Sequence, residues 1–80
     1  EVGKVRSRLE RQLEKYEAQL HESEEESAQL QLQMLDPALS SDYEGLMALQ
    51  KRLEEQQRRQ ESLLERMLET ETQLEDSGLF

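Results

Sequence analysis

Residues 30–53 read LQLQMLDPALSSDYEGLMALQKRL, and an Asp-Pro step divides two helical patterns within this stretch. Proline disfavours helical geometry in the residue before it and lacks an amide hydrogen, so we expect a first helix to end at Leu35. Asp36 is well placed to cap a short turn over the residues that follow it. Ser41 and Glu44 have the spacing of a capping box, which predicts the start of a second helix.

Two apolar stripes flank this turn, and the gaps within each stripe alternate between four and three residues. The first stripe consists of Leu9, Leu13, Tyr16, Leu20, Ser23, Ser27, Leu30 and Met34. The second consists of Leu46, Leu49, Leu53, Gln56, Gln60, Leu63, Met67, Thr70 and Leu74. A period of 3.5 residues is that of a coiled coil, whose narrow seam needs few apolar side chains.

The second stripe repeats the gaps of the first in reverse, so the two come into step when the chain folds back on itself. Eighty residues are too few for two domains. We therefore predict an all-α fold, a single antiparallel two-helix coiled-coil hairpin. The helices are expected at about residues 2–35 and 42–75, with a turn over 36–41 and a tail over 76–80.

Polar residues interrupt the middle of both stripes. When paired residue numbers add up to 83, Ser23 faces Gln60 and Ser27 faces Gln56. Polar seam residues often fix the register of a coiled coil at some cost in stability, which is the interpretation we favour. The alternative is a soft point at which the rod bends or yields on binding.

Charged residues beside the seam agree with the same pairing. Glu24 falls opposite Arg59, and Glu25 falls opposite Arg58. A slipped hairpin would place like charges together, so these pairs help to specify the alignment.

Several apolar residues lie outside the seam. Four of them fall around the turn and are expected to form a small cap over the tip, namely Leu35, Leu39, Tyr43 and Met47. Three others lie along the helices, namely Leu32, Leu64 and Leu68. These three are either exposed or in contact with a parent domain or a second copy.

The composition excludes several classes of function. The chain has no cysteine, no long apolar run and no glycine-rich phosphate loop, and His21 is its single histidine. A rod two helices thick has no room for a concave catalytic pocket. We expect no catalytic residue, no metal, no cofactor and no membrane partner, and we expect a small hairpin like this one to be a piece of a larger protein.

The net charge of −9 is distributed unevenly. Residues 21–45 contain seven carboxylates and no Lys or Arg, which disfavours a phosphate backbone as the main partner. If a polyanion binds, the better surface is the start of the first helix, which carries Lys4, Arg6, Arg8, Arg11 and Lys15. A solvated helix with paired charges is the favoured alternative.

The order of a basic helix, a Leu-Asp-Pro-Ala-Leu-Ser-Ser-Asp-Tyr-Glu turn and a second helix with Leu-Leu-Glu-Arg resembles the C-terminal hairpin of ABC-F ATPases. Residues 4–76 match that pattern in length, helix order and turn position. The residues that carry the resemblance are Asp36, Pro37, Leu39, Asp42, Leu49, Leu53, Leu63 and Leu64.

This resemblance implies a cytoplasmic, non-transporting parent ATPase that acts on the ribosome or on nucleic acid, with its ATP sites outside this chain. The hairpin would be a non-catalytic, monomeric arm that helps to dock the ATPase. Phosphate contacts would then include Lys51, Arg52, Arg58 and Arg59 beside the basic start of the first helix. The alternative is a generic scaffold coiled coil that mediates protein association or dimerisation.

Overall fold

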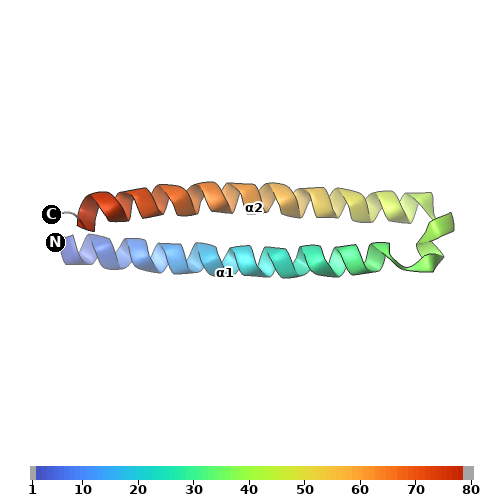
Figure 1. Cartoon of the computed structure of the whole chain (residues 1–80), viewed down its shortest axis with the longest axis horizontal. Coiled ribbons are helices and arrows are strands. Elements are labelled where there is room, and N and C mark those ends of the chain that lie inside the picture. The colour runs from blue at the N-terminus through green and yellow to red at the C-terminus, as the bar shows by residue number, and fades with distance from the viewer. Residues whose placement is uncertain (1, 79–80) are drawn as a thin grey trace.

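The computed structural model describes residues 2–78, which form two long antiparallel helices joined by a short turn (Figure 1). Helix α1 spans Val2–Met34, the 3₁₀ helix η1 spans Pro37–Ser41, and α2 spans Tyr43–Gly78. The Cα atoms extend over 61 × 14 × 13 Å, so the molecule is a rod two helices thick. The prediction of an all-α helical hairpin is confirmed.

The helix ends differ slightly from the expected ones. Helix α1 ends at Met34, one residue before the predicted end, and α2 continues past Glu75 to Gly78. The predicted tail is therefore helical as far as Gly78, while residues 79–80 lie outside the described residues. A glycine costs a helix only about 1 kcal/mol, and residues 76–78 contain no proline that would stop the helix.

Two aspartates cap the helical segments around the turn. The side chain of Asp36 accepts a hydrogen bond from the amide of Ala38 at 3.0 Å, as expected from the sequence. The prediction that Ser41 caps α2 is wrong, because Ser41 is the last residue of η1. The carboxylate of Asp42 takes this role and accepts from the amide of Gly45 at 2.9 Å.

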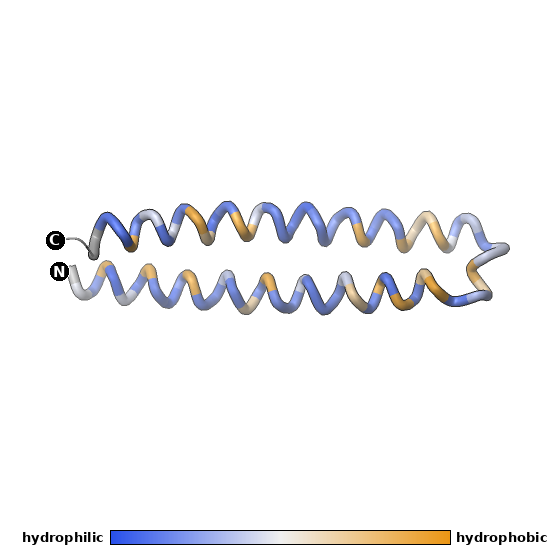
Figure 2. Tube along the Cα trace, in the orientation of Figure 1, coloured by the Kyte–Doolittle hydropathy of each residue, from blue (hydrophilic) through white to orange (hydrophobic). Residues whose placement is uncertain are grey.

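Many apolar residues of both helices lie along the inner edges of the rod (Figure 2). Leu30 and Leu63 are only 1% and 3% exposed, and Leu9 and Leu53 are also buried. A fully buried leucine contributes about 1.5–3 kcal/mol, so these four anchor the hairpin along its length. Seam residues occupy positions a and d of a seven-residue repeat written abcdefg, with Leu9 at d and Leu46 at a.

The expected apolar cap over the tip does not form. Leu35 and Tyr43 are about three-quarters exposed, Met47 is also exposed, and only Leu39 is half-buried. The five-residue helix η1 closes the turn, and Leu39 within it is the one residue of these four that is partly covered. The tip is therefore an exposed apolar surface.

Candidate functional site

The structure places all seventeen seam residues between the helices. Six are buried and the others are half-buried, the buried ones being Leu9, Ser23, Leu30, Leu53, Leu63 and Thr70. Thr70 satisfies its hydroxyl by donating to the carbonyl of Arg66 at 2.8 Å, one turn earlier in α2. No buried side-chain nitrogen or oxygen lacks a partner within the described part of the chain.

Ser23, Ser27, Gln56 and Gln60 form a polar layer in the middle of the seam. The hydroxyl of Ser23 donates to Oε1 of Gln56 at 2.7 Å and accepts from Nε2 of Gln60 at 3.2 Å. The same Nε2 donates to the hydroxyl of Ser27 at 2.8 Å. One amide thus bridges both serines, using its two N–H donors.

This network differs from simple one-to-one pairing. Ser23 and Gln60 are bonded as expected, whereas the partner of Ser27 is Gln60 and the partner of Gln56 is Ser23. Each knob of a coiled coil fits between four residues of the facing helix and therefore contacts more than one of them. The polar layer is consequently a single connected cluster rather than two separate pairs.

The ion pair between the two helices joins different residues from those expected. Nη2 of Arg52 lies 3.3 Å from Oε1 of Glu26, and both residues occupy position g. Glu24 occupies position e and Arg59 position g, so the two lie on opposite sides of the seam. Their predicted pairing is therefore wrong.

The second predicted pair fails for a related reason. Glu25 and Arg58 both occupy position f, which points away from the partner helix. Glu25 instead lies 3.0 Å from Nε2 of His21, one turn earlier in α1. Two residues whose numbers add up to 83 lie at the same level along the rod. Their positions in the seven-residue repeat decide whether they also lie on the same side of the seam.

Positions c and g together form one long side of the rod, which we call the mixed side. Glu22, Glu26 and Arg59 line a common hollow there with Ser23 and Gln56. The basic residues of this side are Arg8, Lys15, Arg52, Arg59 and Arg66, and its acidic residues are Glu22, Glu26, Glu55, Glu69 and Asp76. The two kinds of charge therefore balance on the mixed side.

Arg66 was missed as a candidate contact in the sequence. It follows Arg52 and Arg59 at intervals of seven residues, so the repeat itself was the signal that could have found it. In the register in which paired numbers add up to 83, Arg66 is level with residue 17 of α1, close to Lys15 on the same mixed side. Along the mixed side, Arg66 therefore lies between the basic start of α1 and the arginines in the middle of α2.

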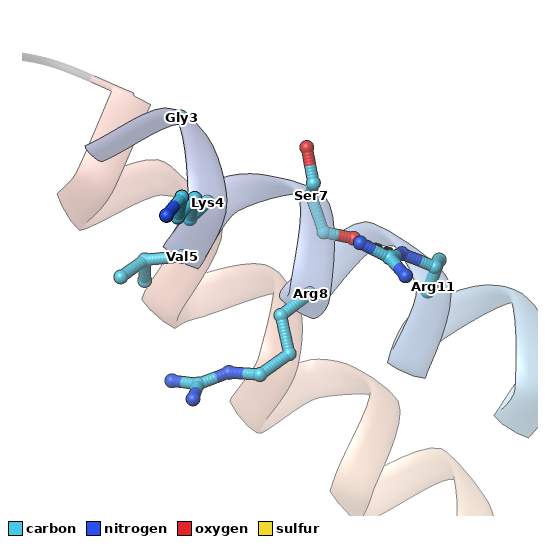
Figure 3. Close-up of a pocket in the computed structure, with 6 residues that line it drawn as sticks. All are labelled: Gly3, Lys4, Val5, Ser7, Arg8 and Arg11. Carbon is cyan, nitrogen blue, oxygen red and sulfur yellow. Dashed lines mark hydrogen bonds between the residues drawn. The ribbon is translucent and has the colours of Figure 1, made fainter. Parts of the chain in front are cut away.

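The remaining candidate phosphate contacts are exposed but do not gather on one surface. At the start of α1, an open hollow is lined by Gly3, Lys4, Val5, Ser7, Arg8 and Arg11 (Figure 3). Arg11 lies back along α1, and its Nε donates to the carbonyl of Ser7 at 3.4 Å. Arg6 lies 3.2 Å from Glu10, whereas Lys51 and Arg58 point outward from α2.

Positions b and e form the opposite long side, which we call the acidic side. It contains no Lys or Arg between residues 3 and 76, although the chain has ten of them. Its eight acidic residues are Glu10, Glu14, Glu17, Glu24, Glu54, Glu61, Glu71 and Glu75. The rod is therefore polarised across its width, with one side balanced and the other strongly negative.

Two further properties of residues 2–78 bear on partners. Their side chains bring together no group of three or more His, Cys, Asp or Glu suited to a metal ion. Neither helix is long and apolar enough to cross a membrane.

Comparisons with known proteins identify the family. The family model described as ABC transporter C-terminal domain matches residues 4–77, which include nearly the whole hairpin. Comparisons with curated proteins and with solved structures gave no significant match. Because the family model covers both helices and the turn, the chain belongs to the ABC transporter C-terminal domain family.

Proposed function

We propose that this hairpin is a non-catalytic interaction arm of an ABC-F-type ATPase, and that it helps to dock the ATPase on the ribosome or on nucleic acid in the cytoplasm. The ATP sites would lie outside this chain. The family match supports a place in an ABC protein, and the turn sequence around Asp36 and Pro37 favours the ABC-F class.

The docking role is supported by the rod shape of the hairpin and by the way its charges are distributed over the two long sides. The start of α1 and the end of α2 lie at one end, so attachment there holds the turn on the order of 60 Å away (Figure 1). In the half of the rod nearest to that end, the mixed side presents three exposed cations, namely Arg8, Lys15 and Arg66, and Arg59 lies near the middle. These side chains suit phosphate contacts, whereas the acidic side repels phosphates.

Titration of the chain with a fluorescent RNA duplex at 50 mM salt tests this role. We expect binding that weakens as salt rises, because each phosphate contact releases a counterion. The variant R8Q/K15Q/R66Q should bind more weakly and with a shallower salt dependence, by about one unit of slope for each lost contact. A matched control neutralises Lys51, Arg58 and Lys4, which point outward at position f.

No detectable binding at 50 mM salt would refute the nucleic-acid contact and leave protein contacts as the docking mode. Equal losses in the two triple variants would refute a specific role for the mixed side.

A second candidate function is a scaffold coiled coil that associates with copies of itself. The exposed apolar residues Leu32, Leu64 and Leu68 favour this possibility, since each is more than half exposed. Sedimentation equilibrium separates the two candidates. An interaction arm should have the mass of one chain over a wide range of concentrations, and a scaffold should form dimers or larger assemblies.

A further inference from the structure

Leu64 and Leu68 form an unpartnered apolar strip on the acidic side of α2. They occupy positions e and b, one helical turn apart, and are 52% and 66% exposed. Neither belongs to the seam, because the neighbouring seam positions are filled by Leu63 and Met67. Two adjacent exposed leucines on a helix this rich in charge are available to a partner.

Glutamates surround this strip on both helices. Glu61, Glu71 and Glu75 continue the same side of α2, one or two turns from the leucines. Across the seam, e positions of the two helices lie on the same side, and Glu17 is the e position of α1 nearest in level to Leu64, because their numbers add up to 81. The combination is an apolar centre with an acidic rim.

The rim contains a repulsion between like charges. Glu10 and Glu71 occupy e positions at nearly the same level of the two helices, and this side carries no Lys or Arg between residues 3 and 76. Like charges that face each other are destabilising, and a cationic partner removes that cost when it binds. The site is therefore complementary to positive charge.

We infer that the Leu64–Leu68 strip with its acidic rim is a docking site for a Lys/Arg-rich amphipathic helix of a partner protein. Apolar residues of that helix, spaced three or four apart, would cover the two leucines, and its flanking cations would meet the glutamates. Charge selects this occupant. A nucleic acid would be repelled, and a second copy would bring its own eight glutamates against these.

This inference goes beyond the proposed function and uses the other side of the rod. An arm that contacts phosphates through its mixed side could at the same time hold a basic protein helix through its acidic side. The mixed side is proposed to bind an anionic partner and the acidic side a cationic one. An experiment that refutes one of these interactions therefore leaves the other standing.

A designed peptide probes the site. We would titrate the full chain, labelled with ¹⁵N, with an 18-residue helical peptide of Leu and Lys whose leucines follow i, i+4, i+7 spacing. A scrambled peptide of the same composition serves as the control. We expect the largest amide shifts at residues 61–75 and 14–24, and affinity at least ten-fold higher than for the scrambled peptide.

Substitutions then separate the strip from general charge attraction. The variant L64Q/L68Q should lose at least ten-fold in affinity, while the control L32Q changes an equally exposed leucine at position f and should bind normally. Because these leucines are exposed, both variants should keep the helical content and melting temperature of the parent chain. That measurement verifies that a loss of binding is not a loss of folding.

Three results would overturn the inference. One is equal binding of the ordered and scrambled peptides, and another is unchanged affinity in L64Q/L68Q. The third is concentration-dependent dimerisation of the chain that L64Q/L68Q abolishes, since a second copy would then be the occupant.

Discussion

Replacing the polar layer with leucine should stabilise the hairpin. Ser23, Ser27, Gln56 and Gln60 occupy a and d positions that leucine fills elsewhere in the same seam, so S23L/S27L/Q56L/Q60L creates two ordinary leucine layers. The change also removes both partners of every hydrogen bond between side chains in the cluster. No buried polar atom is left unpaired, which is the usual reason for a large loss.

The magnitude follows from burial and hydrogen bonding. A fully buried leucine is worth about 1.5–3 kcal/mol, and we take about 1.5 kcal/mol for each of the four sites because three of them are only half-buried. The three side-chain hydrogen bonds that are lost contribute about 1 kcal/mol each. The net gain is about 3 kcal/mol, or a melting temperature on the order of 15 °C higher for a chain of this size.

Single substitution should have the opposite sign. Ser23 is 2% exposed and hydrogen-bonded to both glutamines. S23L alone therefore inserts a larger side chain and leaves Oε1 of Gln56 without its hydroxyl donor. We expect S23L to lose about 1–2 kcal/mol. The non-additivity between single and quadruple variants is the signature of one connected cluster.

Thermal and urea unfolding followed by circular dichroism measure both effects, with sedimentation verifying that each variant has the same mass in solution as the parent chain. A matched control, Q29L/S62L, adds leucines at exposed c positions and should change stability by less than about 0.5 kcal/mol. An unchanged or lower melting temperature for the quadruple variant would refute the assigned seam. A gain in the control as large as that of the quadruple variant would show that added leucine, not the seam, is responsible.

Three smaller effects are also expected. A methyl group at Gly45 would overlap the carboxylate of Asp42, because its Cβ would lie 2.8 Å from Cγ. In urea unfolding, G45A should therefore be nearly neutral in the parent chain but should stabilise the D42A variant by about 1 kcal/mol. Equal effects of G45A in both backgrounds would contradict this cap. In a double-mutant cycle, the exposed Glu26–Arg52 pair should have a coupling energy of less than about 1 kcal/mol, and this coupling should disappear at 1 M salt. A coupling that persists at 1 M salt would be inconsistent with screening by the solvent. L30A should lose about 2–5 kcal/mol of unfolding free energy in denaturant titrations, because this side chain is 1% exposed. The control L32A changes an exposed leucine and should cost less than about 0.5 kcal/mol.

The hairpin architecture was readable from the sequence because two physical signals agree. The Asp-Pro step at Asp36 and Pro37 stops the first helix, and the reversed alternation of gaps matches the two stripes without any tertiary information. The cap by Asp36 followed from local geometry alone. These features depend on residues that are neighbours in the chain.

Features that depend on three-dimensional context were harder to predict. Ser41 and Asp42 are both good N-cap residues, and the length of η1 decided between them. Pairing by residue number places Glu24 at the level of Arg59 but ignores which side of the helix each occupies. The exposure of Tyr43 depends on how tightly the turn closes, which the spacing of apolar residues does not encode.

The separation of charge across the rod has an orientational consequence. A nearby charged surface of either sign exerts a torque about the long axis, because one flank is nearly neutral and the other is uniformly anionic. A cationic surface rotates the rod until the glutamates face it, and an anionic one rotates them away. The hairpin is thus aligned at distances of about a Debye length, roughly 8–10 Å, before any side chain makes contact.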